Sequence, residues 1–270
     1  MTHNFKTTIT SIILFILFST TTLLAKKQNN EQVKLMNIAA KQRMLSQRIA
    51  KDYLYMHKNI AVGKTKKELK NSLLEFFKAH KTLVNSIKDE DIHNLLEFVE
   101  LSSNDFRQTS EQEFSLDNAQ LILDLSESML EGSQYIVDSL KSSITTEQSK
   151  TIEISGKQRM LSQRIAKYYI AYQSGIKDEN TIRSMKETVI EFSENLTILI
   201  GNKENTPLIQ KKINEIDKLW KIVHKFYNNI EKGGLPLIVF NTTNKITKKM
   251  NNITQLYLTI QNNTIKDKKK

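Results

Sequence analysis

The segment KQRMLSQRIAK occurs twice without a single difference, at residues 41–51 and at residues 157–167. The two copies are related by an offset of 116 residues, which carries Lys41 onto Lys157. The same offset aligns other similar residues: Ile38 with Ile154, Tyr53 with Tyr169, 74–76 with 190–192, and 121–123 with 237–239. A repeat of this length predicts two copies of one domain, each of roughly a hundred residues.

The composition predicts an almost entirely helical chain. Its 270 residues include only two prolines and seven glycines, which are the residues that most often interrupt helices. There is no cysteine, which excludes disulfides, thiolate metal sites and cysteine nucleophiles.

Turn-forming residues divide the chain into segments of helical length. We expect helices over 29–60, 65–88, 92–108, 116–173, 178–200, 206–231 and 236–263. The fourth would be the last helix of the first repeat and, without interruption, the motif helix of the second. The predicted fold is all-α, with two tandem four-helix up-and-down bundles that share one long continuous helix.

The N-terminus predicts export from the cytoplasm. Residues 1–25 contain Lys6, then an apolar run and Leu23-Leu24-Ala25, as in a signal peptide; an uncleaved N-terminal anchor is the alternative. We therefore expect a periplasmic protein that is soluble or tethered by this segment. The first sensor-like repeat would cover 26–140, the second 141–263, and a basic tail 264–270.

The charge of the chain is concentrated in the repeated motif. The formal net charge is +11, and each motif copy contains four basic residues and no acidic one. No glycine-rich phosphate loop, paired catalytic carboxylates or Ser/His/Asp set is visible, and no histidines have metal-ligand spacing. We therefore expect no enzyme activity, no cofactor and no metal. The expected export argues against nucleic-acid binding, and the absence of aromatic residues interleaved in the motif argues against recognition of a single strand.

A helical wheel separates the two arginines of the motif. At about 100° per residue, Ile38, Leu45, Ile49 and Met56 mark a core face, and Arg43 lies on a separate stripe of small residues. Arg48, Lys41 and Lys51 fall on the predicted outward side. The second copy repeats this pattern with Arg159 on its small-residue stripe.

If the two small-residue stripes pack together, Arg43 and Arg159 face each other. Two guanidinium groups about 4 Å apart repel by on the order of 4 kcal/mol at an effective dielectric near 20, so an anion between them is favoured. The alternative is that carboxylates neutralise the arginines, with Glu75 and Glu191 as candidates. Ser46 and Ser162 either donate to a ligand or simply permit close packing.

Both motif segments resemble a known sensor family. NIAAKQRMLSQR at 37–48 and ISGKQRMLSQR at 154–164 are similar to the N-terminal sensor module of type IV pilus methyl-accepting chemotaxis transducers (PilJ-like). These are relatives of nitrate and nitrite sensor kinases such as NarX. The resemblance implies a periplasmic four-helix bundle whose motif helix binds an anion through its first arginine, here Arg43 and Arg159. The family's glycine before the motif corresponds to Gly156 and is replaced by Ala40 in the first copy.

These observations predict an exported, non-catalytic, sensor-type protein that binds a small nitrate-like or nitrite-like anion, or another small ligand. The expected partners are a membrane-bound chemoreceptor or sensor kinase and, if the motif helices pair between chains, a second copy in a homodimer. The alternative is a structural or adaptor bundle without a ligand. The predicted ligand-binding residues are Arg43, Arg159, Ser46, Ser162, Gly156 and Ala40. The predicted secondary basic surface consists of Lys41, Arg48, Lys51, Lys157, Arg164 and Lys167.

Overall fold

The computed structural model describes residues 31–142, 147–232 and 234–267, and these residues are helical apart from short connections. The expected export segment, 1–25, lies outside the described residues. Among the described helices, none has both the length and the apolar composition needed to cross a bilayer. The all-α prediction is confirmed.

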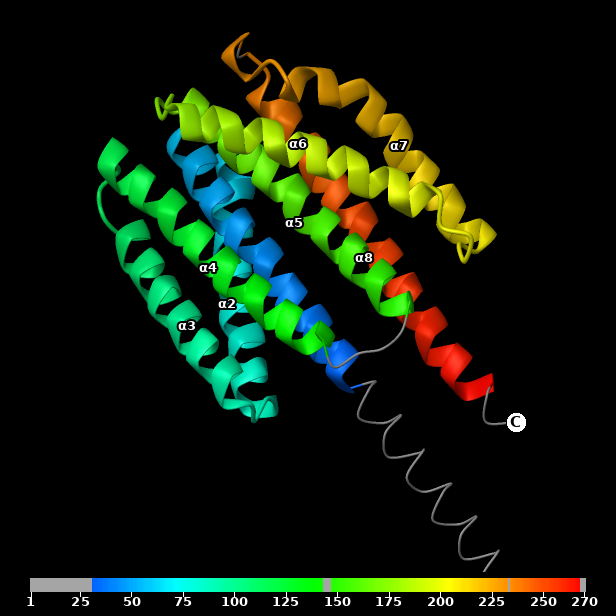
Figure 1. Cartoon of the computed structure of the whole chain (residues 1–270). Coiled ribbons are helices and arrows are strands. Elements are labelled where there is room, and N and C mark those ends of the chain that lie inside the picture. Colours follow the sequence, from blue (N-terminus) through cyan, green and yellow to red (C-terminus); the bar gives the residue numbers. More distant parts are fainter. Residues whose placement is uncertain (1–30, 143–146, 233, 268–270) are drawn as a thin grey trace, which may run out of the picture.

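The helices follow the order predicted from the sequence (Figure 1). The first motif helix covers residues 31–57 and is followed by α2 (Val62–Ser86), α3 (Glu90–Ser110) and α4 (Leu116–Ser142). The second motif helix is α5 (Glu147–Gln173), followed by α6 (Glu179–Ile200), α7 (Pro207–Tyr227), the short 3-10 helix η1 (Ile230–Lys232) and α8 (Pro236–Asp267). The helix α8 continues through Asp267, so the tail expected from residue 264 begins as helix.

Side-chain caps explain where several helices begin. Asp89 accepts a hydrogen bond from the backbone N–H of Ile92 at 3.0 Å, and Asp178 accepts one from Thr181 at 2.8 Å. Each cap satisfies a donor that the first helical turn leaves unpaired. Thr206 caps α7 in the same way, and Pro207 occupies the first turn, where its missing N–H costs nothing.

The two motif helices end in the same way at equivalent positions. Asn59 and Gly175 both adopt positive φ, of 57° and 112°. The backbone N–H of Ile60 then bonds to the carbonyl of Tyr55 at 3.0 Å, and that of Ile176 to Ala171 at 3.1 Å. This left-handed termination satisfies the last carbonyls of both helices.

The single helix expected over 116–173 is wrong, because α4 and α5 are separate helices that run antiparallel. Lys141, near the end of α4, lies 3.7 Å from Glu153 near the start of α5, and Glu127, earlier on α4, lies 2.6 Å from Arg164, farther along α5. The sequence at 142–146 is SSITT, and serine, threonine and isoleucine all have lower helix propensity than alanine or leucine. Antiparallel packing also lets the motif helices bury faces that an end-to-end helix would leave in water.

The two groups of four helices lie side by side rather than end to end. Figure 1 shows the first motif helix between α4 and α5, with α3 and α7 at opposite outer sides. Buried apolar side chains from both groups form one contiguous core. The motif helices therefore occupy the centre of the molecule.

Because of this central position, few side chains of the motif are exposed to solvent. Between residues 39 and 55 all side chains except Lys41 and Arg48 are buried, and between 152 and 171 all except Lys157 and Arg164. The prediction that Lys51 and Lys167 lie on a basic surface is wrong, since both are 0 % exposed. The wheel assumed one solvent-facing side, whereas neighbouring helices surround these two.

We expect Gly156→Leu to lower the free energy of unfolding by about 2 kcal/mol or more, because overpacking forces neighbours apart. A Cβ at this position would already lie 3.3 Å from Nη2 of Arg159 and 3.4 Å from Cβ of Ala40. Gly156→Ala is the control: its gain in helix propensity, about 1 kcal/mol, offsets the tight contact. Urea denaturation measures both, and a leucine variant as stable as wild type would contradict the close crossing.

Candidate functional site

The first arginines of the two motif copies converge where the motif helices cross. Gly156 faces Ala40 at this crossing, and a Cβ built on Gly156 would lie 3.3 Å from Nη2 of Arg159 and 3.9 Å from Nη2 of Arg43. Both guanidinium groups are buried, with residue exposures of 0 % for Arg43 and 1 % for Arg159. The two helices therefore meet within one chain, and their small residues allow the approach.

Each arginine reaches across to the opposite motif helix at an equivalent position. Arg159 donates from Nη2 to Oδ1 of Asn37 at 3.0 Å. Arg43 places Nη1 3.5 Å from Oε1 of Glu153, the residue that the repeat offset aligns with Asn37. The two halves of the site thus share a geometry and differ in charge.

In the first half, acidic residues balance Arg43. Burial lowers the pKa of Arg43 below its ordinary value, and the negative charges of Glu153 and Asp138 oppose that shift. Arg43 also donates from Nη1 to the side-chain oxygen of Gln134 on α4. The positive charge of Arg43 is therefore compensated inside the protein.

In the second half, Arg159 has only amide partners. It donates from Nη1 to Oδ1 of Asn251 at 3.0 Å and from Nη2 to Asn37, and no carboxylate of the described residues lies within 4.0 Å of it. Burial, and then the positive charges of Arg43 and Arg48, lower its pKa to about 10. It remains protonated at neutral pH, and its Nε is buried without a hydrogen-bond partner. Arg159 is a buried cation without a counter-ion.

The second arginines also differ from each other, but here the arginine of the second copy is the one with a carboxylate. Nη2 of Arg164 lies 2.6 Å from Oε2 of Glu127, and Glu127 also accepts from the buried Lys167. Arg48 is the equivalent of Arg164, and it has no carboxylate within 4.0 Å among the described residues; its Nε is buried and unpartnered. Acidic residues thus pair with Arg43 of the first copy and with Arg164 and Lys167 of the second, and leave Arg159 and Arg48 without a carboxylate among the described residues.

Lys51 forms part of an internal network rather than a surface. Its Nζ lies 3.0 Å from Oδ1 of Asp52 and donates to Oε1 of Gln163 at 2.8 Å and to Oδ1 of Asn244 at 2.7 Å. Burial raises the pKa of Asp52 to about 6, against the opposing effect of Lys51. This network ties the first motif helix to α5 and α8.

The motif serines are engaged within the protein. Ser46 donates to the backbone carbonyl of Arg43 at 2.8 Å, and Oγ of Ser162 lies 2.9 Å from the carbonyl of Arg159 and 2.5 Å from Oγ1 of Thr247. Both hydroxyls are buried. This geometry favours the interpretation of these serines as small residues that permit packing.

Glu75 and Glu191 do not neutralise the arginines, so that expectation is wrong. Oε2 of Glu75 lies 2.7 Å from Nζ of Lys41, and Glu191 pairs with Lys157 at the equivalent position. Each acid faces the more exposed lysine at the start of the motif, because the arginines point inward to the helix crossing.

Arg159 opens onto a groove of about 900 Å³ between the first motif helix, α2 and α8, which we call the basic groove. Arg43 does not line it. The charged residues that line it are six basic and two acidic: Lys41, Arg48, Lys64, Arg159, Lys245 and Lys248, with Glu68 and Glu75. Asparagines from the first motif helix and α8 complete the walls. The structure thus places the counter-ion-free arginine in an accessible, positively charged recess.

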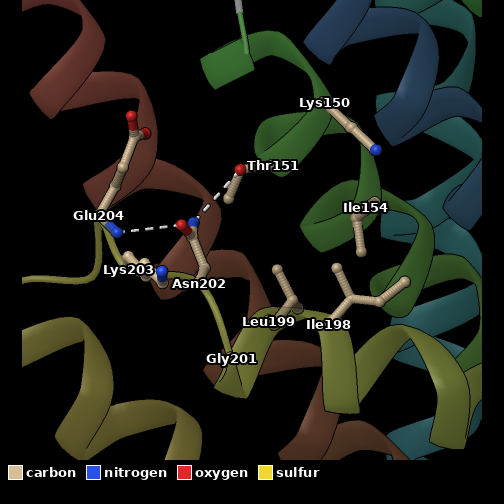
Figure 2. A pocket seen from close by; sticks show the side chains of 9 residues that line it. All are labelled: Lys150, Thr151, Ile154, Ile198, Leu199, Gly201, Asn202, Lys203 and Glu204. Atoms are coloured by element: carbon tan, nitrogen blue, oxygen red, sulfur yellow. Dashed lines mark hydrogen bonds between the residues drawn. The ribbon is translucent and has the colours of Figure 1, made fainter.

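A smaller pocket, of about 370 Å³, lies where α5 begins and α6 ends (Figure 2). Nδ2 of Asn202 donates to Oγ1 of Thr151 at 3.3 Å, and Oδ1 of Asn202 accepts from the backbone N–H of Glu204 at 3.0 Å. Figure 2 shows this side chain bridging the turn after α6 to α5. No residue of the repeated motif lines this pocket. The hydrogen bonds of Asn202 stabilise the turn after α6.

Sequence reasoning missed the residues that distinguish the two halves. The repeat offset aligns Asn37 with Glu153. A comparison of charge at equivalent positions of the two repeats could therefore have identified them. Asn251 and Glu127 lie on α8 and α4, far from the motif in sequence. No local pattern marks them, because only the packing of the helices brings them to the arginines.

Comparison with known proteins identifies one part of the chain. Residues 142–256 match the PilJ family, described as the type IV pili methyl-accepting chemotaxis transducer N-terminal domain. The match covers α5, α6, α7 and most of α8, together with Arg159. The chain matches no curated protein and no solved structure. That residues 26–140 are a second copy of this domain stays a prediction.

We expect Glu127→Gln to lower the free energy of unfolding at pH 7 by about 3 kcal/mol, because it leaves the buried Lys167 without its carboxylate. Burial would raise the pKa of Glu127, but Lys167 and Arg164 outweigh burial and lower it to about 2. Its ionised form therefore stabilises the fold fully above its unfolded pKa of 4.5, and this stabilisation is lost as pH falls toward 2.

Chemical denaturation at several pH values tests this, with the exposed Glu194→Gln as the control. The difference in free energy of unfolding between wild type and Glu127→Gln is expected to become smaller below about pH 4.5. If this difference in free energy of unfolding stayed constant with pH, the charge of the Glu127 carboxylate would not be the source of the stabilisation.

Proposed function

We propose that the chain is a sensory protein that binds a small anion at Arg159, since residues 142–256 match the type IV pili methyl-accepting chemotaxis transducer N-terminal family. The observation that carries the proposal is the buried guanidinium of Arg159, which faces the basic groove without a carboxylate. A buried charge without a partner is costly, and an anion entering from solvent would remove that cost.

The chemistry of Arg159 suits a small planar oxyanion such as nitrate or nitrite. Guanidinium groups present a rigid fork of N–H donors that binds two oxygens of one anion. The Nε–H of Arg159 is unpartnered, and Nη1 and Nη2 bond only to neutral amides, which a charged acceptor readily replaces. Nη2 of Arg43, also buried and unpartnered, adds positive potential at the same crossing.

Anion binding would be sensed as a change between the motif helices. Arg159 lies on α5 and contacts Asn37 on the first motif helix and Asn251 on α8. A ligand that competes for these contacts has different affinities for different arrangements of the three helices, which is the requirement for shifting a conformational equilibrium. We propose that a membrane-bound chemoreceptor or sensor kinase reads this change in the periplasm, and that the chain itself is non-catalytic.

The ion pairs of the other basic motif residues favour a structural role for those residues. Arg43, Arg164 and Lys167 are each paired with Glu153 or Glu127, as expected of a device that locks helices together. If Arg159 and Arg48 were also structural, the chain would be an adaptor bundle without a ligand. That second function predicts that no anion raises the melting temperature.

We expect sodium nitrate to raise the melting temperature of the protein, by comparison with sodium chloride at equal ionic strength. Arg159→Gln is expected to remove this difference and to weaken nitrate binding at least tenfold in calorimetry, about 1.4 kcal/mol. The control is Arg183→Gln, the same substitution at a side chain that is 64 % exposed. Nitrate stabilisation that survives Arg159→Gln would exclude the proposed site, and its absence in wild type would favour the adaptor.

A further inference from the structure

The basic groove is far larger than a nitrate ion. Four residues of the first motif helix line it, from Asn37 to Arg48, and this span corresponds to about 16 Å along the helix axis. On α8 the lining extends from Asn241 to Gln255, about 21 Å. A volume near 900 Å³ falls at the upper end of the range of pockets that hold organic ligands. A four-atom anion at Arg159 would leave most of the groove to water.

The acidic residues of the groove are already paired. Glu75 lies 2.7 Å from Lys41. Glu68 lies 3.7 Å from Lys51 and 4.0 Å from Lys64, and it accepts hydrogen bonds from Nδ2 of Asn244. These carboxylates therefore neutralise the lysines beside them and not the arginines of the groove.

Four cations of the groove remain unpaired. Within the described residues no carboxylate lies within 4.0 Å of Arg48, Arg159, Lys245 or Lys248. Lys245 and Lys248 are exposed at the rim on α8, whereas Arg159 is buried at the floor on α5. Arg48 projects from the first motif helix, and its charge is close enough to lower the pKa of Arg159. The positive charge thus extends from the floor to the rim.

We propose that the ligand of the basic groove is a small organic molecule with two or more anionic groups, carboxylate or phosphate. One group would bind Arg159 at the floor, and a second would bind Arg48, Lys245 and Lys248 nearer the rim. This inference rests on the proposed function and adds the class of ligand. The amides of Asn241 and Asn251 supply neutral hydrogen-bonding groups for the uncharged part of such a molecule.

Calorimetry with citrate, pyrophosphate and nitrate tests the inference at constant ionic strength. We expect citrate or pyrophosphate to bind at least ten times more tightly than nitrate, and the tighter of the two identifies carboxylate or phosphate chemistry. The double variant Lys245→Gln/Lys248→Gln is expected to weaken that polyanion at least tenfold and to leave nitrate within twofold. The control, Lys218→Gln/Lys225→Gln, removes two exposed lysines from α7, outside the groove.

The outcomes separate this inference from the proposed function. Equal affinities for nitrate and the polyanions, or a polyanion affinity that the rim substitutions leave unchanged, would overturn the inference and leave a small-anion site at Arg159 standing. The inference and the proposed function would both be overturned if all three probes still bound the Arg159→Gln variant, or if none of them bound the wild-type protein. Because the rim lysines are exposed, their substitution is not expected to affect folding.

Discussion

The structure depends on the close crossing of two motif helices that bury like charges against each other. The contact of Gly156 with Ala40 brings Arg43 and Arg159 to one point of the core, where solvent cannot screen their repulsion. Glu153 reduces that repulsion from one side. Among the described residues no carboxylate pairs with Arg159, whose partners are two asparagines. The central packing of the molecule and its candidate ligand site are therefore consequences of the same contact.

Identical sequences have acquired different surroundings in the two halves. The motif copies agree at every position, yet Arg43, Arg164 and Lys167 are paired with acids while Arg159 and Arg48 are not. The difference arises outside the motif: Glu153 corresponds to Asn37 in the other repeat, and Glu127 corresponds to Thr243. Each copy therefore contributes one arginine to ion pairs on the side of α4, which stabilise the fold, and one arginine without a carboxylate on the side of α8, where a ligand could bind.

Much of the architecture follows from local sequence signals, and the site follows from them only in part. The end of the second motif helix before Gly175 and the start of α7 at Pro207 were predictable because turn and cap chemistry is local. The facing of Arg43 and Arg159 was predictable from the stripe of small residues. The break between α4 and α5 and the burial of Lys51 were not, since both depend on which helices surround the motif. The counter-ions Glu153 and Glu127 reach the arginines only through tertiary packing.

The central claim is that Arg159 lacks a counter-ion and that an external anion supplies one. Asn37→Glu tests it most directly, because it gives Arg159 the carboxylate that Glu153 gives Arg43. The quantity to measure is the free energy of unfolding of this variant and of wild type, in chloride and in nitrate at equal ionic strength. The account predicts that the variant is more stable than wild type in chloride, by about 2 kcal/mol, and that nitrate no longer stabilises it. A variant that is less stable than wild type and still responds to nitrate would contradict the account.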